Sequence, residues 1–147
     1  MQFSTKMRYG TRALVELARA YPEDNLSVRE IAERQDISAK YLEHIMAQLK
    51  TAGIVRSVRG IHGGYCLAQT PGDCHLSEVF EAVEGSAAPV ECVDEPEVCP
   101  LKEKCTTRKT WAEVKEAIME VLERTTLQDL LERDEEYHES DMQSYQI

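Results

Sequence analysis

Three cysteines in the second half of the chain have the residue type and spacing that best suit chemistry. Cys92, Cys99 and Cys105 are separated by six and then five residues. The prolines and acids between the first two exclude a regular helix or a central strand there. Ordering such a loop costs roughly 1–2 kcal/mol per residue, which a bound metal centre would offset. Iron–sulfur clusters are held by thiolates. The pattern therefore predicts a metal-binding sensor loop over residues 86–106.

Three other interpretations of these cysteines stay open. Structural zinc favours Cys pairs separated by two to four residues, and the chain has no such pair. A metal-free switch would join two of the thiols in a disulfide, and the cysteines could also have no role. Of the five cysteines, Cys66 is expected to be a small buried hydrophobe and Cys74 is not expected to be a ligand.

Length and composition suit one small domain with an appended arm. The 147 residues are 42% apolar, which is enough to form a core. The sequence contains no run of about 18 apolar residues and no apolar signal region at its start, so we expect a cytoplasmic protein with no membrane partner. Thiols stay reduced in that compartment.

The charge of the chain is divided unevenly. Residues 1–66 carry a net +3 and residues 67–147 a net −13, within a total of −10. This division is expected if only the front half contacts phosphates. Acidic residues that merely solvate the back half would produce the same pattern.

The front half contains the pattern of a helix-turn-helix. Apolar residues recur at helical spacing over residues 4–21, 27–35 and 38–53. Short helices joined by a tight turn, the second with polar residues near its start, are typical of DNA-binding motifs. The side chains expected to meet DNA are Ser38, Lys40, Tyr41, Glu43 and His44. The alternative is that these are ordinary surface residues, with Tyr41 partly in the core.

A β-hairpin is predicted directly after the third helix. Residues 54–58 are predicted to form one strand and residues 65–68 its partner, and glycines at the tip allow a tight turn. Such a hairpin is the wing of a winged helix-turn-helix, and wings contact phosphates or the minor groove. The contact residues predicted here are Arg59, His62, Gly63 and Gly64. A plain hairpin covering a small core is the alternative.

The back half predicts a pairing helix and a tail. We expect Ser77 to cap a short helix that ends at Gly85. Residues 107–125 form an amphipathic pattern long enough to pair with a second copy, although docking on its own domain is the alternative. We expect a short helix through residue 131 and a disordered acidic tail over 132–147. The predicted divisions are 1–85 for DNA binding, 86–106 for sensing and 107–131 for dimerisation.

Three motifs carry a family resemblance: STKMRYG at residues 4–10, ISAKYLE at 37–43 and VRGIHGGY at 58–65. Together they resemble the winged-helix iron–sulfur regulators typified by IscR and the nitric-oxide sensor NsrR, over roughly residues 1–131. The resemblance implies a homodimer that binds double-stranded operator DNA, with a cluster on Cys92, Cys99 and Cys105. It implies a [2Fe–2S] rather than a [4Fe–4S] cluster, iron–sulfur assembly genes as targets, and iron–sulfur assembly proteins as candidate partners.

Two features depart from that family. The first cysteine interval is one residue longer than in the IscR type. The position of the IscR-type fourth ligand holds Arg108, which has no lone pair to donate, and the position of the NsrR-type acidic ligand holds Arg8. The fourth ligand is therefore unassigned; Glu103, another acid or an outside ligand could supply it.

These observations predict a transcription repressor rather than an enzyme. The chain has no Cys-x-x-Cys pair, no phosphate-binding glycine loop and no His-rich cleft. We expect the cluster to control operator binding. The alternatives are control of the same DNA-binding fold by thiol oxidation or by a partner protein, and an interaction module that no longer binds DNA.

Overall fold

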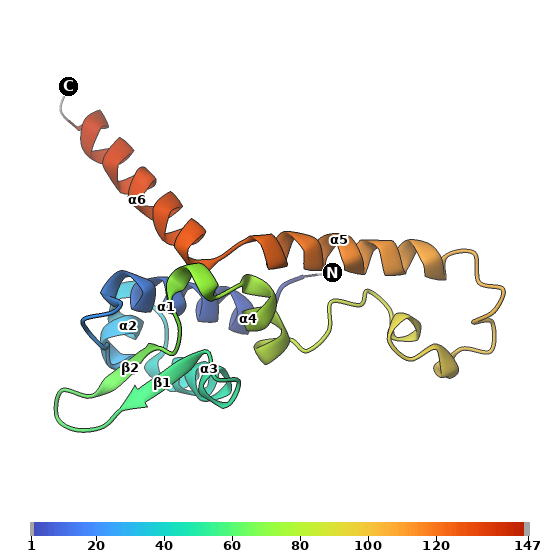
Figure 1. Cartoon of the computed structure of the whole chain (residues 1–147), viewed down its shortest axis with the longest axis horizontal. Helices are drawn as coiled ribbons and strands as arrows, with labels where there is room; N and C mark the ends of the chain where they lie inside the picture. The colour runs from blue at the N-terminus through green and yellow to red at the C-terminus, as the bar shows by residue number, and fades with distance from the viewer. Residues whose placement is uncertain (1, 146–147) are drawn as a thin grey trace.

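The computed structural model describes residues 2–145 and is mostly helical, with one two-stranded sheet (Figure 1). The predicted fold class, mainly α with a small β-wing, is confirmed. None of the described helices is long and apolar enough to cross a membrane. The elements in chain order are α1 (Thr5–Ala20), α2 (Val28–Gln35), α3 (Ala39–Thr51), β1 (Val55–Val58), β2 (Gly64–Leu67), η1 (Pro71–Asp73), α4 (Leu76–Val83), η2 (Glu91–Val93), η3 (Pro96–Val98), α5 (Arg108–Arg124) and α6 (Leu127–Ser144).

Side-chain caps begin four of the helices. The Ser27 hydroxyl accepts from the Glu30 N–H at 3.1 Å, while the Glu30 carboxylate accepts from the Ser27 N–H at 2.7 Å. Ser4, Ser38 and Thr126 cap α1, α3 and α6 by accepting from backbone N–H groups in the first turn. These hydrogen bonds satisfy donors that a helix start otherwise leaves unpaired. Each of these four helices therefore begins at a Ser or Thr cap.

The start of α4 differs from the sequence prediction. Ser77 lies inside the helix and is buried, and its hydroxyl donates to the Glu123 carboxylate of α5. The residue before the helix is His75, whose N–H donates to Glu78 at 3.0 Å. The Leu76 N–H donates to the Thr125 carbonyl at 2.9 Å. Contacts with the distant α5–α6 junction thus begin this helix, in place of the serine cap.

The core lies between α1, α2, α3, α4 and the hairpin, and Leu122, Leu127 and Leu131 of α5 and α6 also belong to it. Gly10 of α1 allows a close crossing, since a Cβ there would lie 3.1 Å from the Ile45 Cγ2 of α3. This close packing holds α3 against the rest of the front half. The largest fully buried side chains are Leu14, Leu17, Ile31, Leu42, Ile45, Met46, Leu49, Val55, Leu67, Cys74, Val79 and Leu127.

The hairpin is joined to the front of the helix-turn-helix. β1 and β2 pair antiparallel with Val58 opposite Gly64. Leu26, just before α2, exchanges two backbone hydrogen bonds with Tyr65, at 2.9 and 2.8 Å. A Cβ on Gly64 would lie 2.3 Å from the Leu26 carbonyl oxygen, so this close approach requires glycine. The strands begin and end within one residue of their predicted limits.

The C-terminal helix is longer than the sequence predicted. α6 runs to Ser144 and extends away from the body of the molecule (Figure 1). Arg19 of α1 pairs with Asp134, and Gln128 donates to Glu132 at 2.9 Å within the helix. The prediction of a disordered tail from residue 132 was therefore wrong for residues 132–144, because glutamate-rich segments also have good helix propensity. Residues 146 and 147 of that tail lie outside the described residues.

Candidate nucleic-acid interface and cysteine loop

Helix α3 buries one face and exposes the other. Leu42, Ile45 and Leu49 are at most 1% exposed and anchor the helix in the core. The other face of α3 is exposed along its first turns. Four of the five residues predicted to meet DNA are exposed there, namely Ser38, Lys40, Glu43 and His44. The apolar core thus presents these polar groups to solvent on a rigid helix.

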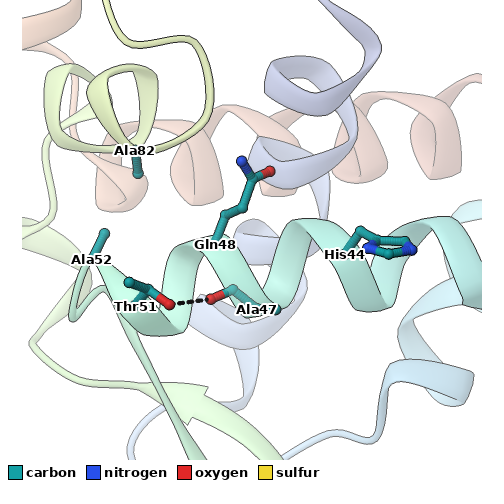
Figure 2. Close-up of a pocket in the computed structure, with 6 residues that line it drawn as sticks. All are labelled: His44, Ala47, Gln48, Thr51, Ala52 and Ala82. Carbon is teal, nitrogen blue, oxygen red and sulfur yellow. Dashed lines mark hydrogen bonds between the residues drawn. The ribbon is translucent and has the colours of Figure 1, made fainter.

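A hollow continues the exposed surface of α3 towards its C-terminal end. Figure 2 shows His44, Ala47, Gln48 and Thr51 along the helix, with Ala52 and with Ala82 from α4 across the gap. The Thr51 hydroxyl donates to the Ala47 carbonyl at 3.0 Å and is occupied within the helix. Gln48 carries a side-chain amide of the kind that pairs with adenine edges. Sequence reasoning missed Gln48, although its spacing of four from His44 places both on one face.

Tyr41 is half-buried between α1 and α3. Its hydroxyl donates to the Thr5 hydroxyl at 3.2 Å. Its ring meets the Tyr9 ring edge to face, with centroids 6.0 Å apart. This residue therefore braces the start of α3 against α1. The predicted phosphate contact would have to share its hydroxyl with Thr5.

The wing presents cations on a tight turn. Arg59 and His62 are exposed at its tip. The Gly63 N–H donates to the Gly60 carbonyl at 3.0 Å, and a Cβ on Gly63 would lie 2.1 Å from the Val58 carbonyl oxygen. Gly60 adopts φ +111°, which side chains rarely tolerate. The glycines thus shape the turn that carries Arg59 and His62.

From His44 onward, the charged residues of this surface segment are all basic. Residues 44–72 contain no Asp or Glu, and they carry Lys50, Arg56 and Arg59. This stretch covers most of α3 and the whole hairpin, which lie on the side of the molecule away from α5 (Figure 1). In a chain with a net charge of −10, such a segment favours contact with an anionic partner.

The cysteine loop runs from the end of α4 to the start of α5 and carries three half-buried thiols. Cys92 lies in η2, Cys99 follows η3, and Cys105 precedes α5. Within residues 2–145, no group of three or more His, Cys, Asp or Glu side chains is placed to hold a metal ion. The described conformation of the loop therefore does not gather the predicted ligands.

Polar contacts tie this loop to α5. The Arg108 guanidinium donates to the Cys92 carbonyl at 2.9 Å. Lys115 donates to the Asp94 carboxylate at 2.6 Å, and Ser86 donates to the same carboxylate. These contacts hold the pKa of Asp94 below its usual range, with the Lys115 hydrogen bond as the largest cause. The first predicted ligand is thus fastened to the beginning of the long helix.

The thiols differ in their readiness to ionise. The Thr107 hydroxyl lies 3.4 Å from the Cys105 sulfur, and this hydrogen bond, with backbone N–H groups of Arg108 and Thr107, lowers the pKa of the Cys105 thiol. Burial raises the pKa of Cys74 to about 11. Cys105 is therefore suited to act as a thiolate ligand or nucleophile, whereas Cys74 is suited to the core.

The donor set suits a thiolate-bound cluster in the type of donor, and the three cysteines would supply three of the usual four ligands. The position that would supply a fourth ligand holds Arg108, whose guanidinium is engaged with Cys92. Glu103 is exposed on the same loop. A cluster on this chain would require the loop to close and a fourth donor to come from Glu103, another acid or outside the chain.

Helix α5 exposes an apolar face. Val114 and Val121 are 37% and 48% exposed, and Trp111 near its start is 39% exposed. This face forms one wall of an apolar groove lined by Phe3, Val114, Ala117, Ile118, Val121 and Leu122. The amphipathic pattern predicted over residues 107–125 thus leaves a large part of its apolar side uncovered in one chain.

Comparison with known proteins now decides the family. Residues 3–133 match the Rrf2 family, described as iron-dependent transcriptional regulators. The chain belongs to the Rrf2 family. It is 42% identical over 131 residues to protein rrf2 of Nitratidesulfovibrio vulgaris, covering 89% of this chain and 87% of that protein.

Two solved structures of Rrf2-family regulators resemble this fold closely. CymR of B. subtilis, described as the global cysteine regulator, superimposes with a TM-score of 0.77 at 34% identity, covering 90% of this chain and 98% of that one. IscR of T. potens gives a TM-score of 0.76 at 38% identity, covering 93% and 90%. The predicted winged-helix regulator family is confirmed, as is the prediction that the chain is a regulator rather than an enzyme.

Proposed function

We propose that this Rrf2-family regulator is a homodimeric repressor that binds operator DNA through α3 and the wing, under the control of the cysteine loop. The observation that carries the DNA-binding part is the acid-free segment 44–72, which lies on an exposed helix face and hairpin in an otherwise acidic chain. Phosphates of double-stranded DNA are the anionic partner that such a surface fits.

Each part of the surface has a role in this proposal. Ser38 and Lys40 bind phosphate at the start of α3, while Glu43 and His44 reach base edges in the major groove. A carboxylate such as Glu43 accepts from the amino group of cytosine and repels phosphate, so it selects sites more than it adds affinity. Arg59 and His62 of the wing contact the flanking backbone or minor groove, with Gly63 and Gly64 allowing the close approach.

Dimerisation follows from the apolar face of α5. Two recognition helices must meet half-sites about 34–36 Å apart, or a multiple of this distance, at the same time. One chain leaves the apolar groove at Phe3, Val114 and Val121 exposed. Packing of this face against the same face of a second copy would bury that apolar surface. A small change in the angle between the two copies then alters the fit of both α3 helices.

The finer proposal concerns control by an iron–sulfur cluster, of the [2Fe–2S] type, on Cys92, Cys99 and Cys105. A bound cluster supplies a centre that responds to oxidants and to small ligands. The residues of the chain transmit the state of the loop: Arg108 and Lys115 connect the segment around Cys92 and Asp94 to α5. A change in loop conformation therefore acts on the proposed dimer helix. Iron–sulfur assembly genes are the proposed targets, and iron–sulfur assembly proteins are candidate partners.

A second candidate keeps the DNA binding and replaces the cluster by thiol oxidation or by a partner protein. Two observations favour it: the described loop does not gather the three thiols, and the chain resembles a cysteine regulator as closely as it resembles an IscR. The lowered pKa of Cys105 suits such chemistry as well.

DNA binding is tested by selecting an operator from random duplexes and measuring affinity by fluorescence anisotropy at several salt concentrations. Arg59→Ala should weaken binding to all sequences and reduce the salt slope by about 1, because one phosphate contact is lost. Arg133→Ala is the matched control, since it removes the same charge from exposed α6. Failure of the wild type to prefer any operator over random DNA at physiological salt would overturn the proposal.

The two forms of control are separated by anaerobic purification with iron and sulfide analysis. Cluster control predicts visible thiolate-to-iron absorption with matching iron and sulfide, lost in Cys99→Ala and kept in the matched variant Cys66→Ala. A colourless, iron-free protein after anaerobic reconstitution would remove the cluster and favour the thiol or partner mechanism.

A further inference from the structure

The side chain at the tip of the wing has no role in the proposed function. Ile61 is 99% exposed, more than any other large apolar side chain within residues 2–145. It lies in the five-residue turn 59–63 that joins β1 to β2, between the exposed Arg59 and His62. Isolated exposed apolar residues are common on proteins, so exposure by itself assigns Ile61 no role.

The turn holds its shape through its own backbone. The Gly63 N–H donates to the Gly60 carbonyl at 3.0 Å, which closes the turn around Ile61. Gly60 at φ +111° and Gly63, where a Cβ would lie 2.1 Å from the Val58 carbonyl oxygen, allow this tight turn because neither position readily accepts a side chain. The hairpin base is held by the two hydrogen bonds between Leu26 and Tyr65. The wing therefore presents an apolar side chain at the tip of a hairpin that is hydrogen-bonded at its turn and at its base.

The surroundings of this side chain indicate what it meets. Arg56, Arg59 and His62 lie on the same hairpin, and no Asp or Glu occurs anywhere in residues 44–72. A surface with this charge is drawn to a phosphate backbone. In the minor groove, which wings contact, an apolar side chain finds apolar surface at sugars and between bases, and isoleucine is among the wedges that minor-groove proteins insert at base steps.

We propose that Ile61 is a specificity-determining residue that enters the minor groove at the flank of each half-site and partly unstacks one base step. The inference rests on the proposed DNA binding by α3 and the wing, and it adds a rule of site choice. Pyrimidine–purine steps such as TA unstack easily, whereas A-tracts are stiff. Ile61 therefore favours operators with a flexible step under the wing, while Arg59 supplies affinity independent of sequence.

The test starts from the selected operator. Hydroxyl-radical footprints of the wild type and Arg59→Ala locate the minor groove under the wing. Operators with a TA step or an AA step at that position are then compared, and 2-aminopurine is placed at the same step. We expect the wild type to prefer TA by roughly tenfold, an effect typical of one altered base pair, and to raise 2-aminopurine fluorescence on binding.

Ile61→Ser should abolish both the step preference and the fluorescence increase, with the salt slope unchanged. The substitution removes a fully exposed side chain and should leave thermal unfolding unaltered. Met142→Ser is the matched control, because Met142 is a 69% exposed apolar residue on α6, and it should behave as wild type.

Three results would overturn the inference. Ile61→Ser could bind specifically with the step preference intact, in which case α3 and the wing bind DNA without a wedge and the proposed function stands. Ile61→Ser could instead change the oligomeric state without changing step preference, which would assign Ile61 to a protein contact. Finally, the wild type could fail to distinguish operator from random duplex, which would remove the proposed function together with the inference.

Discussion

The proposed DNA-binding surface and the cysteine loop are built in opposite ways. The exposed residues of α3 sit on a helix whose other side, including Leu42 and Leu49, is completely buried. In residues 86–106, all of which the structure describes, Ala87 is the only buried residue. The first region is shaped by apolar packing, which needs no cofactor, and the second by a few polar contacts. A regulator built this way would keep its proposed DNA-binding surface constant while its proposed sensor loop stays easy to rearrange.

The largest difference between the two regions should be in stability. Leu14→Ala removes a fully buried side chain from the front core, and it should lower the free energy of unfolding by about 2–5 kcal/mol because it leaves a cavity. Val98→Ala in the loop should change the free energy of unfolding by less than about 0.5 kcal/mol. Urea denaturation followed by circular dichroism measures both. Equal losses would mean that the loop belongs to the folding core.

The reactivity of the cysteine thiols should also differ between the two regions. At pH 8 a thiol with a pKa of about 11, as in Cys74, is ionised in roughly one molecule in a thousand, and the side chain is also fully buried. The pKa of Cys105 is lowered, so its thiolate persists to lower pH than that of an ordinary cysteine. In metal-free protein Cys105 should be alkylated at least about a hundredfold faster than Cys74, as followed by mass spectrometry.

Two controls sharpen this measurement. Thr107→Val removes the hydroxyl that lowers the pKa of Cys105 and should slow its alkylation. In denaturant, the two cysteines should react at similar rates. Fast alkylation of Cys74 in the folded protein would contradict the packing described for the front half.

A cap in the front half should have a moderate effect. Ser27→Ala removes one half of the capping box of α2 and should lower the free energy of unfolding by about 1 kcal/mol, whereas the exposed Ser57→Ala should have little effect.

The pKa of Glu30 is lowered, chiefly by the Ser27 backbone hydrogen bond. The stability that Glu30 contributes is therefore present above its ordinary pKa and is lost as pH falls through the lowered value. The difference in free energy of unfolding between wild type and Glu30→Gln should therefore be smaller at acid pH than at neutral pH, as measured by denaturation at both.

The smallest effect should come from the tether of the loop. Asp94→Asn weakens the contacts with Lys115 and Ser86, and should leave the denaturation midpoint unchanged while amide exchange in residues 91–98 becomes faster. Glu95→Gln, which removes a neighbouring charge, is the matched control. Unchanged exchange in Asp94→Asn would mean that other contacts hold the loop.

Local patterns in the sequence were enough to predict most of the front half. The caps at Ser4, Ser27, Ser38 and Thr126, the three apolar helix periods and the glycine turn of the wing all act within a few residues, so their hydrogen bonds and spacing can be read directly. The exposure of Lys40, Glu43 and His44 follows from the same helical period. Their proposed roles in binding DNA stay predictions.

Long-range contacts decided the rest. Ser77 lies inside α4 because Glu123 and Thr125, far along the chain, meet the start of that helix. The Tyr41 hydroxyl is held by Thr5, and Arg108 reaches back to Cys92. No local period or capping pattern encodes such pairings, because each depends on how separate elements pack. The start of α6 also depends on packing, since it lies against α1, whereas the exposed residues 135–144 are helical through their own hydrogen bonds and helix propensity.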